Sequence, residues 1–189
     1  MRILVFDNYD SFTYNIVHAL RELNVDCDVV RNDKINLDEI ENYDKIIISP
    51  GPGIPDEAGV LMPMLKRYAD KKPILGICLG HQAIGQHYGC RLFNLTEVFH
   101  GVATDIKVNN HDYLFEGLPD KFSVGRYHSW VVDTTGFNND DLEIIASDED
   151  GMIMALRHKK YDIRGVQFHP ESILTPNGMK IIENWVKKI

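Results

Sequence analysis

Short apolar runs alternate with helical patterns through the first half of this 189-residue chain. The apolar runs are strand-sized, and the stretches between them carry apolar residues three or four positions apart. We expect strands at residues 3–6, 25–29, 46–48 and 73–77, with helices following residue 10, at 57–68 and from about residue 81. Such alternation indicates an α/β fold with a mostly parallel central sheet and helices on both faces.

The second half has a different pattern, in which strand-like segments follow one another with turn residues between them. We expect strands at 102–108, 122–127, 143–146, 152–156 and 163–168, and a final helix at 179–188. No repeat, low-complexity tract or linker interrupts the chain. We therefore expect a single domain over residues 1–189, with a β-rich segment added to the α/β core in its second half.

Composition excludes several classes of function. The formal net charge is −8, which disfavours electrostatic binding to nucleic acid or to anionic lipid. Three cysteines, Cys27, Cys78 and Cys90, are too few and oddly numbered for a disulfide framework. The apolar run at the amino terminus is too short for a signal peptide or a membrane span. We expect a cytoplasmic protein.

A cysteine between glycines follows the expected strand at 73–77. The sequence Gly76-Ile77-Cys78-Leu79-Gly80 precedes a helix-like stretch beginning near His81, which is the setting of a nucleophile elbow. We expect the glycines to permit the sharp turn, the helix amino terminus to favour the thiolate, and the Leu79 N–H to face a developing oxyanion. A buried structural cysteine beside packing glycines would show the same pattern.

A histidine suited to act as the base lies in the sequence 165–172, Gly-Val-Gln-Phe-His-Pro-Glu-Ser. Pro170 favours an extended conformation at His169, and in an extended stretch His169 and Glu171 project to the same side. The carboxylate can then orient the ring and stabilise its charged form. An exposed strand end is the alternative. A metal site is disfavoured, because no second histidine or cysteine stands at metal-binding spacing nearby.

A loop rich in proline and glycine, Ser-Pro-Gly-Pro-Gly-Ile-Pro at 49–55, follows the strand at 46–48. Because proline has no N–H, only Gly51, Gly53 and Ile54 can donate between Pro50 and Pro55. A stiff loop with fixed donors suits an oxyanion hole. A rigid strand-to-helix connection would look the same, and the lysine of a phosphate-binding P-loop is missing.

Taken in this order, the three motifs resemble those of the class I, or triad, glutamine amidotransferases. The resemblance covers essentially the whole chain, and residues 76–82 and 168–172 carry it. It implies a flavodoxin-like three-layer fold, no cofactor, and L-glutamine as substrate. It also implies the following roles: Cys78, His169 and Glu171 catalytic; Gly53 and Leu79 in the oxyanion hole; Gly51, Pro52, Gly53, Gln82, Ser129 and Trp130 in glutamine binding.

Within that family, residues 7–15, Asp-Asn-Tyr-Asp-Ser-Phe-Thr-Tyr-Asn, resemble the small glutaminase subunits that serve chorismate-using enzymes. These are component II of anthranilate synthase and the glutaminase component of aminodeoxychorismate synthase. Trp130 is a departure, since Tyr-His-Ser is usually followed there by an aliphatic residue. The implied partner is a separate chorismate-binding synthase subunit, and residues 7–15 are a candidate contact surface, although a helix cap with core aromatics explains them equally well.

Two other functions stay open at this point. One is a stand-alone cysteine hydrolase of γ-glutamyl compounds, which would need no partner. The other is a non-enzymatic scaffold that kept the fold, which the complete set of catalytic residue types argues against. Between anthranilate for tryptophan and aminodeoxychorismate for folate, the glutamine chemistry is the same, and we expect anthranilate synthase because it is the more common of the two.

Overall fold

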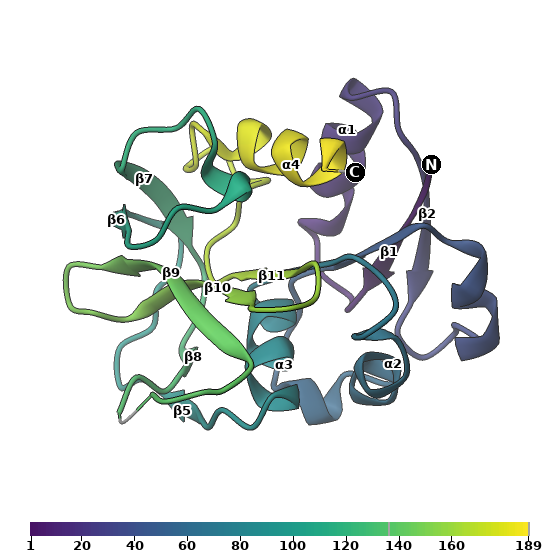
Figure 1. The fold of residues 1–189 in the computed structure, drawn as a ribbon, viewed down its shortest axis with the longest axis horizontal. Helices are drawn as coiled ribbons and strands as arrows, with labels where there is room; N and C mark the ends of the chain where they lie inside the picture. The colour runs from purple at the N-terminus through teal and green to yellow at the C-terminus, as the bar shows by residue number, and fades with distance from the viewer. Residues whose placement is uncertain (136, 189) are drawn as a thin grey trace.

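The computed structural model describes residues 1–135 and 137–188 (Figure 1). Gly136 and Ile189, which the expected 1–189 domain includes, lie outside the described residues. The described chain forms a nine-stranded sheet in the order β2-β1-β3-β4-β11-β10-β9-β6-β7. The first five strands in this order are parallel neighbours: β2 (Asp26–Arg31), β1 (Arg2–Asp7), β3 (Lys45–Ile48), β4 (Ile74–Ile77) and β11 (Ile163–Val166).

The β-rich second half extends the same sheet with antiparallel pairs. The central sheet is therefore mixed, and the expected parallel part is its first five strands. The antiparallel strands are β10 (Ile153–His158), β9 (Leu142–Asp148), β6 (Val102–Val108) and β7 (Lys121–Arg126). A separate two-stranded sheet, which we did not expect, joins β5 (Leu92–Asn94) to β8 (Trp130–Val132).

Helices cover both faces of the sheet, so the three-layer expectation is confirmed. In Figure 1, α1 (Thr13–Glu22) and α4 (Gly178–Lys187) lie on one side, and α2 (Leu61–Tyr68) and α3 (Leu79–His87) on the other. Alternation along β1 explains this: Ile3 and Val5 belong to the core beneath α1 and α4, whereas Leu4 and Phe6 belong to the core beneath α2 and α3. Among the described residues, no helix combines the length and the apolar character needed to cross a membrane.

Short 3-10 turns occupy some of the connections between these elements. They span Leu37–Asn42, Pro55–Glu57 and Tyr113–Phe115. The expected helix at 57–68 is thus divided, because a 3-10 turn ends at Glu57 and α2 starts only at Leu61.

A buried lysine holds the last helix against the sheet. Lys45, at the start of β3, donates from Nζ to the carbonyl oxygens of Trp185 (2.9 Å), Val186 (3.2 Å) and Lys188 (2.6 Å). Carbonyls in the last turn of a helix have no partner within it. Lys45 therefore supplies the donors that end α4, and burial lowers the pKa of its ammonium group.

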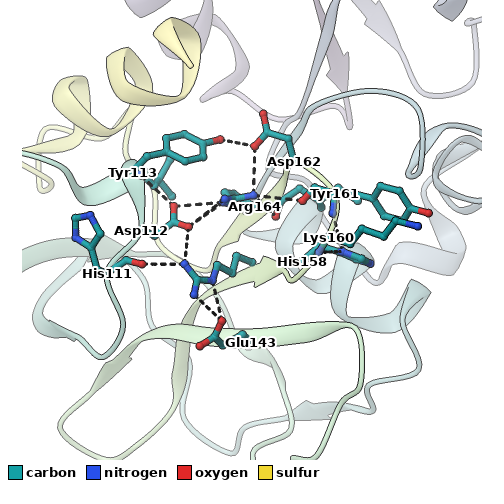
Figure 2. A network of polar contacts seen from close by, with 12 residues as sticks. His111, Asp112, Tyr113, Glu143, His158, Lys160, Tyr161, Asp162 and Arg164 are labelled. Atoms are coloured by element: carbon teal, nitrogen blue, oxygen red, sulfur yellow. Dashed lines mark hydrogen bonds and ion pairs between the residues drawn. The ribbon is translucent and has the colours of Figure 1, made fainter. Parts of the chain in front are cut away.

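An arginine–carboxylate cluster lies where the 3-10 turn at 113–115 meets β10 and β11 (Figure 2). Asp112, 3% exposed, accepts from the Leu114 N–H and from the guanidinium groups of Arg157 and Arg164. Arg157 also pairs with Glu143 (2.7 Å). We call Asp112, Glu143, Arg157 and Arg164 the Asp112 cluster; it fastens the turn to the sheet.

Candidate active site

Cys78 occupies the turn between β4 and α3 in a strained backbone conformation. Its φ is 52° and its ψ is −101°, a left-handed region that residues other than glycine rarely adopt. The side chain is nearly buried, at 6% exposure. Because α3 begins at Leu79, directly after the cysteine, Cys78 lies at the helix amino terminus, where the partial positive charge favours a thiolate.

The flanking glycines act through their lack of a Cβ and not through a positive φ. The positive φ belongs to Cys78, whereas Gly76 and Gly80 have ordinary φ values. A Cβ on Gly76 would lie 2.5 Å from the carbonyl group of Gly80, and a Cβ on Gly80 would lie 2.7 Å from the carbonyl oxygen of Ile48. The glycines permit the turn, as expected, by avoiding a Cβ clash: they allow β4, α3 and β3 to approach one another closely.

His169 and Glu171 form a buried pair. Nδ1 of His169 lies 2.7 Å from Oε1 of Glu171, and the two side chains are 2% and 0% exposed. The backbone of His169 is fixed on both sides, since its N–H donates to Gly125 (3.0 Å) and its carbonyl accepts from the Thr175 hydroxyl (2.6 Å). The backbone position of His169 is therefore fixed, and the Glu171 carboxylate orients the ring.

Two aromatic rings enclose the imidazole. The rings of Phe12 and Tyr127 lie 5.1 Å and 4.9 Å from the His169 ring, centre to centre, in edge-on geometry. Phe12 comes from the amino-terminal motif, immediately before α1. Part of that motif thus packs against the candidate base rather than facing a partner.

Charge stabilisation at His169 is strong. Burial lowers the pKa of the ring, but the nearby Cys78 sulfur and the Glu171 carboxylate outweigh burial and raise the pKa to about 10. At neutral pH the ring is therefore a cation beside the sulfur, and a neighbouring cation favours the thiolate form of a cysteine. Nε2 is buried and makes no hydrogen bond of ordinary geometry within the described residues, so it is available to a reacting group.

The loop after β3 lies against the elbow. A Cβ on Gly51 would be 2.5 Å from Cβ of Asn8 and 2.8 Å from the Leu79 side chain. Gly53 has a φ of 72° and is exposed, as is Pro52. Leu79 is the first residue of α3, so its N–H has no partner within the helix. The structure thus brings the two expected oxyanion donors, Gly53 and Leu79, to the same edge of the sheet.

Gly51, Pro52 and Gly53, three of the residues expected to bind glutamine, lie in this loop, and two others, Gln82 and Trp130, contact each other. Gln82, 3% exposed on the first turn of α3, donates from Nε2 to the carbonyl oxygen of Trp130 (2.7 Å). Trp130 takes part in this contact through its backbone carbonyl, so its unusual side chain is not involved in it. Ser129, which precedes it, is half-buried.

Two buried residues at the site had no expected catalytic or substrate-binding role. Gln167 is fully buried and lies with its Nε2 3.7 Å from the Cys78 sulfur. Asn8 donates to Ser49 from both its backbone and its side chain, at 2.9 Å each, and so holds the start of the oxyanion loop. In an extended stretch the side chains of residues 167, 169 and 171 project to the same side, and this alternation could have revealed Gln167. Nothing local in the sequence points to the role of Asn8.

Comparisons with known proteins agree with this geometry. The family model described as glutamine amidotransferase class-I matches residues 4–189. The chain is 45% identical over 188 residues to anthranilate synthase component 2 of Pyropia yezoensis, covering 98% of each protein. It is 46% identical over 189 residues to the bifunctional protein TrpGD of Thermotoga maritima, covering 98% of this chain but 32% of that longer protein.

A solved structure extends the comparison to the fold. The crystal structure of a candidate GMP synthase subunit from Thermoplasma acidophilum superimposes with a TM-score of 0.87 at 31% sequence identity, covering 98% of this chain and 92% of that one. With the family model matching nearly every residue and the elbow, the histidine–glutamate pair and the glycine loop in one place, the chain belongs to the class-I glutamine amidotransferase family.

Proposed function

We propose that this chain is the glutaminase subunit of an anthranilate synthase, releasing ammonia from L-glutamine for a chorismate-binding synthase subunit. The observation that carries the proposal is the buried His169–Glu171 pair, 2.7 Å apart, together with Cys78 at a strained elbow on a helix amino terminus. The anthranilate assignment, in preference to aminodeoxychorismate, is supported by relatives that carry the anthranilate name at 45% identity over nearly their full length.

The first half of the reaction makes a thioester. The Cys78 thiolate attacks the side-chain carbonyl carbon of glutamine, and the N–H groups of Gly53 and Leu79 donate to the resulting oxyanion. His169 then gives its Nε2 proton to the departing nitrogen, the C–N bond breaks, and ammonia leaves. Glu171 keeps the ring oriented and its positive charge compensated.

The second half restores the enzyme. Neutral His169 takes a proton from water as the water attacks the thioester carbonyl, and the C–S bond breaks to give glutamate and the thiolate. Gly51, Pro52, Gln82, Ser129 and Trp130 hold the amino acid end of the substrate in this proposal. Gln82 uses Nε2 to donate to Trp130, which leaves its Oε1 as an acceptor for a substrate ammonium group.

The test of the nucleophile uses two nitrogen sources. In the complex with a chorismate-binding subunit, Cys78→Ser is expected to abolish glutamine-dependent anthranilate synthesis and to spare synthesis from added ammonium. Equal loss of both activities would assign Cys78 a structural role and overturn the proposal.

The test of the partner compares the chain alone with the complex. We expect weak glutaminase activity from the isolated chain and a clear rise on adding the chorismate-binding subunit. Full activity of the isolated chain, unchanged by the partner, would favour a stand-alone γ-glutamyl hydrolase. The aromatic side chains of the 7–15 segment that face solvent, and so could meet a partner, are Tyr9 and Tyr14, which are 48% and 62% exposed. A cytoplasmic location stays a prediction.

A further inference from the structure

Gln167 is a fully buried polar residue in the stretch that carries His169 and Glu171. It directly follows β11, and its N–H donates to the Met154 carbonyl (2.9 Å), which continues the sheet pairing. Val166 and Phe168, its neighbours, pack into the hydrophobic core. The side chain of Gln167 therefore points the opposite way, toward the catalytic residues.

A chain of hydrogen bonds fixes which end of each side chain donates. Arg126 Nε lies 3.1 Å from His128 Nε2, and His128 Nδ1 lies 3.1 Å from the Trp130 carbonyl oxygen. A guanidinium group can only donate and a carbonyl can only accept. His128 must therefore be neutral with its proton on Nδ1. Burial and the Arg126 charge, which lower the pKa of His128 to about 3, agree with this assignment.

The same assignment of donors and acceptors extends through Gln82 and Gln167 to the Cys78 sulfur. The Trp130 carbonyl requires the nitrogen end of Gln82, whose Nε2 is 2.7 Å away and also lies 3.2 Å from Oε1 of Gln167. Gln167 must then present its oxygen to Gln82, which leaves its nitrogen facing Cys78 Sγ at 3.7 Å. Both carboxamides are thus oriented by groups whose polarity cannot reverse.

We propose that Gln167 donates an amide N–H to the Cys78 sulfur and stabilises its thiolate form, with Gln82 holding the carboxamide in the required orientation. This rests on the proposed role of Cys78 as nucleophile. A donor binds an anionic acceptor more strongly than a neutral one, so the contact favours the thiolate over the thiol. Gln82 thereby links the substrate-binding side of the site to the nucleophile.

The test measures how the reactivity of Cys78 depends on pH. The full chain is treated with iodoacetamide from pH 5 to pH 10, and modification of each cysteine is followed by peptide mass spectrometry. Gln167→Met keeps the length of the side chain and removes the donor. We expect its Cys78 profile to move upward by roughly one pH unit, since a tenfold change in the thiol–thiolate equilibrium is one unit.

A second variant, Gln167→Glu, keeps the shape of the side chain and replaces the amide nitrogen, a donor, with a carboxylate oxygen, an acceptor. In Gln167→Glu the carboxylate still accepts from Gln82 but repels the thiolate, so we expect a larger upward movement of the profile. Cys27, which is partly buried and far along the chain from this site, is the internal control in every sample, and its profile is expected to stay unchanged. If Gln167→Met fails to fold, Gln167→Glu carries the test.

The alkylation rate of Cys78 at high pH, where the rate no longer changes with pH, distinguishes thiolate stabilisation by Gln167 from a purely structural role of Gln167. Once the thiolate is fully formed, alkylation in Gln167→Met is expected to be at least as fast as in the wild type, because an unbound thiolate is the stronger nucleophile. An unmoved Cys78 profile in both folded variants would overturn the inference. Failure of the proposed function is a distinct result: Cys78→Ser would then retain glutamine-dependent synthesis, or lose it together with ammonium-dependent synthesis, whatever Gln167 does.

Discussion

The Asp112 cluster, centred on a buried carboxylate, and the active site are both polar, yet they differ in how completely their groups are paired. In the Asp112 cluster both carboxylate oxygens and two guanidinium groups bind one another, and Asp112 also accepts a backbone N–H. At the active site, His169 Nε2 and Glu171 Oε2 are buried without a partner within the described residues. Paired groups hold the fold, whereas unpaired ones remain available for a reaction.

The largest expected effect is on stability and comes from breaking the closed cluster. Asp112→Ala would leave Arg157 and Arg164 without their shared carboxylate, and removing one partner of a buried ion pair costs about 3–5 kcal/mol. Urea unfolding measures this loss. Glutaminase activity per folded molecule is expected to stay near that of the wild type, and a selective loss of activity would show that the two regions are coupled.

The next effect is on activity alone. Glu171→Gln keeps the size of the side chain but removes the charge that compensates the His169 cation, so we expect glutamine-dependent kcat to fall by roughly 10²-fold or more. The free energy of unfolding should change by less than in Asp112→Ala. Ammonium-dependent synthesis by the complex is the control, and an equal fall there would point to a damaged interface with the partner.

A smaller loss of stability is expected at Lys45, which serves only the fold. Lys45→Met keeps the long apolar stem and removes the donors to the carbonyls at the end of α4, costing about 1–3 kcal/mol. Hydrogen exchange should show the loss confined to α4 and its neighbours. Uniformly faster exchange over the whole chain would instead mean that the helix unfolds only with the entire domain.

The smallest expected effect near neutral pH is a pH dependence of stability. The pKa of His169 in the folded protein is raised to about 10, above its ordinary value of about 6.5. Its stabilising contribution is therefore complete below about pH 6.5 and is lost as pH rises toward 10. Urea unfolding of wild type and His169→Gln from pH 6 to pH 10 should show the difference shrinking.

Local patterns in the sequence predict the parallel half of the fold well. The apolar runs at 46–48 and 73–77 correspond to β3 and β4, and the strand expected at 102–108 has the bounds of β6. The strands β5 and β8 were missed because each has only three residues, too few for alternation to show. The division of the 57–68 stretch was missed as well, since turn geometry decides it and apolar spacing does not.

The candidate site was only partly predictable for a similar reason. His169 and Glu171 are two residues apart, so their contact follows from local geometry. The strain at Cys78 and the contact of Gln167 with its sulfur depend on how β4 and β11 lie side by side. The role of Asn8 likewise depends on β1 lying beside β3. No short-range pattern contains these distances, and each appears only when strands distant in sequence are placed together.

The pairing of β4 with β11 also determines when, during synthesis and folding of the chain, the active site can assemble. Gln167 and the sulfur it faces are 89 positions apart, and His169 and Glu171 follow still later in the chain. A ribosome making this protein completes the cysteine elbow long before it makes the residues that activate it. The growing chain therefore carries an ordinary thiol, and the reactive form arises only in a late step, when β11 enters the sheet between β4 and β10.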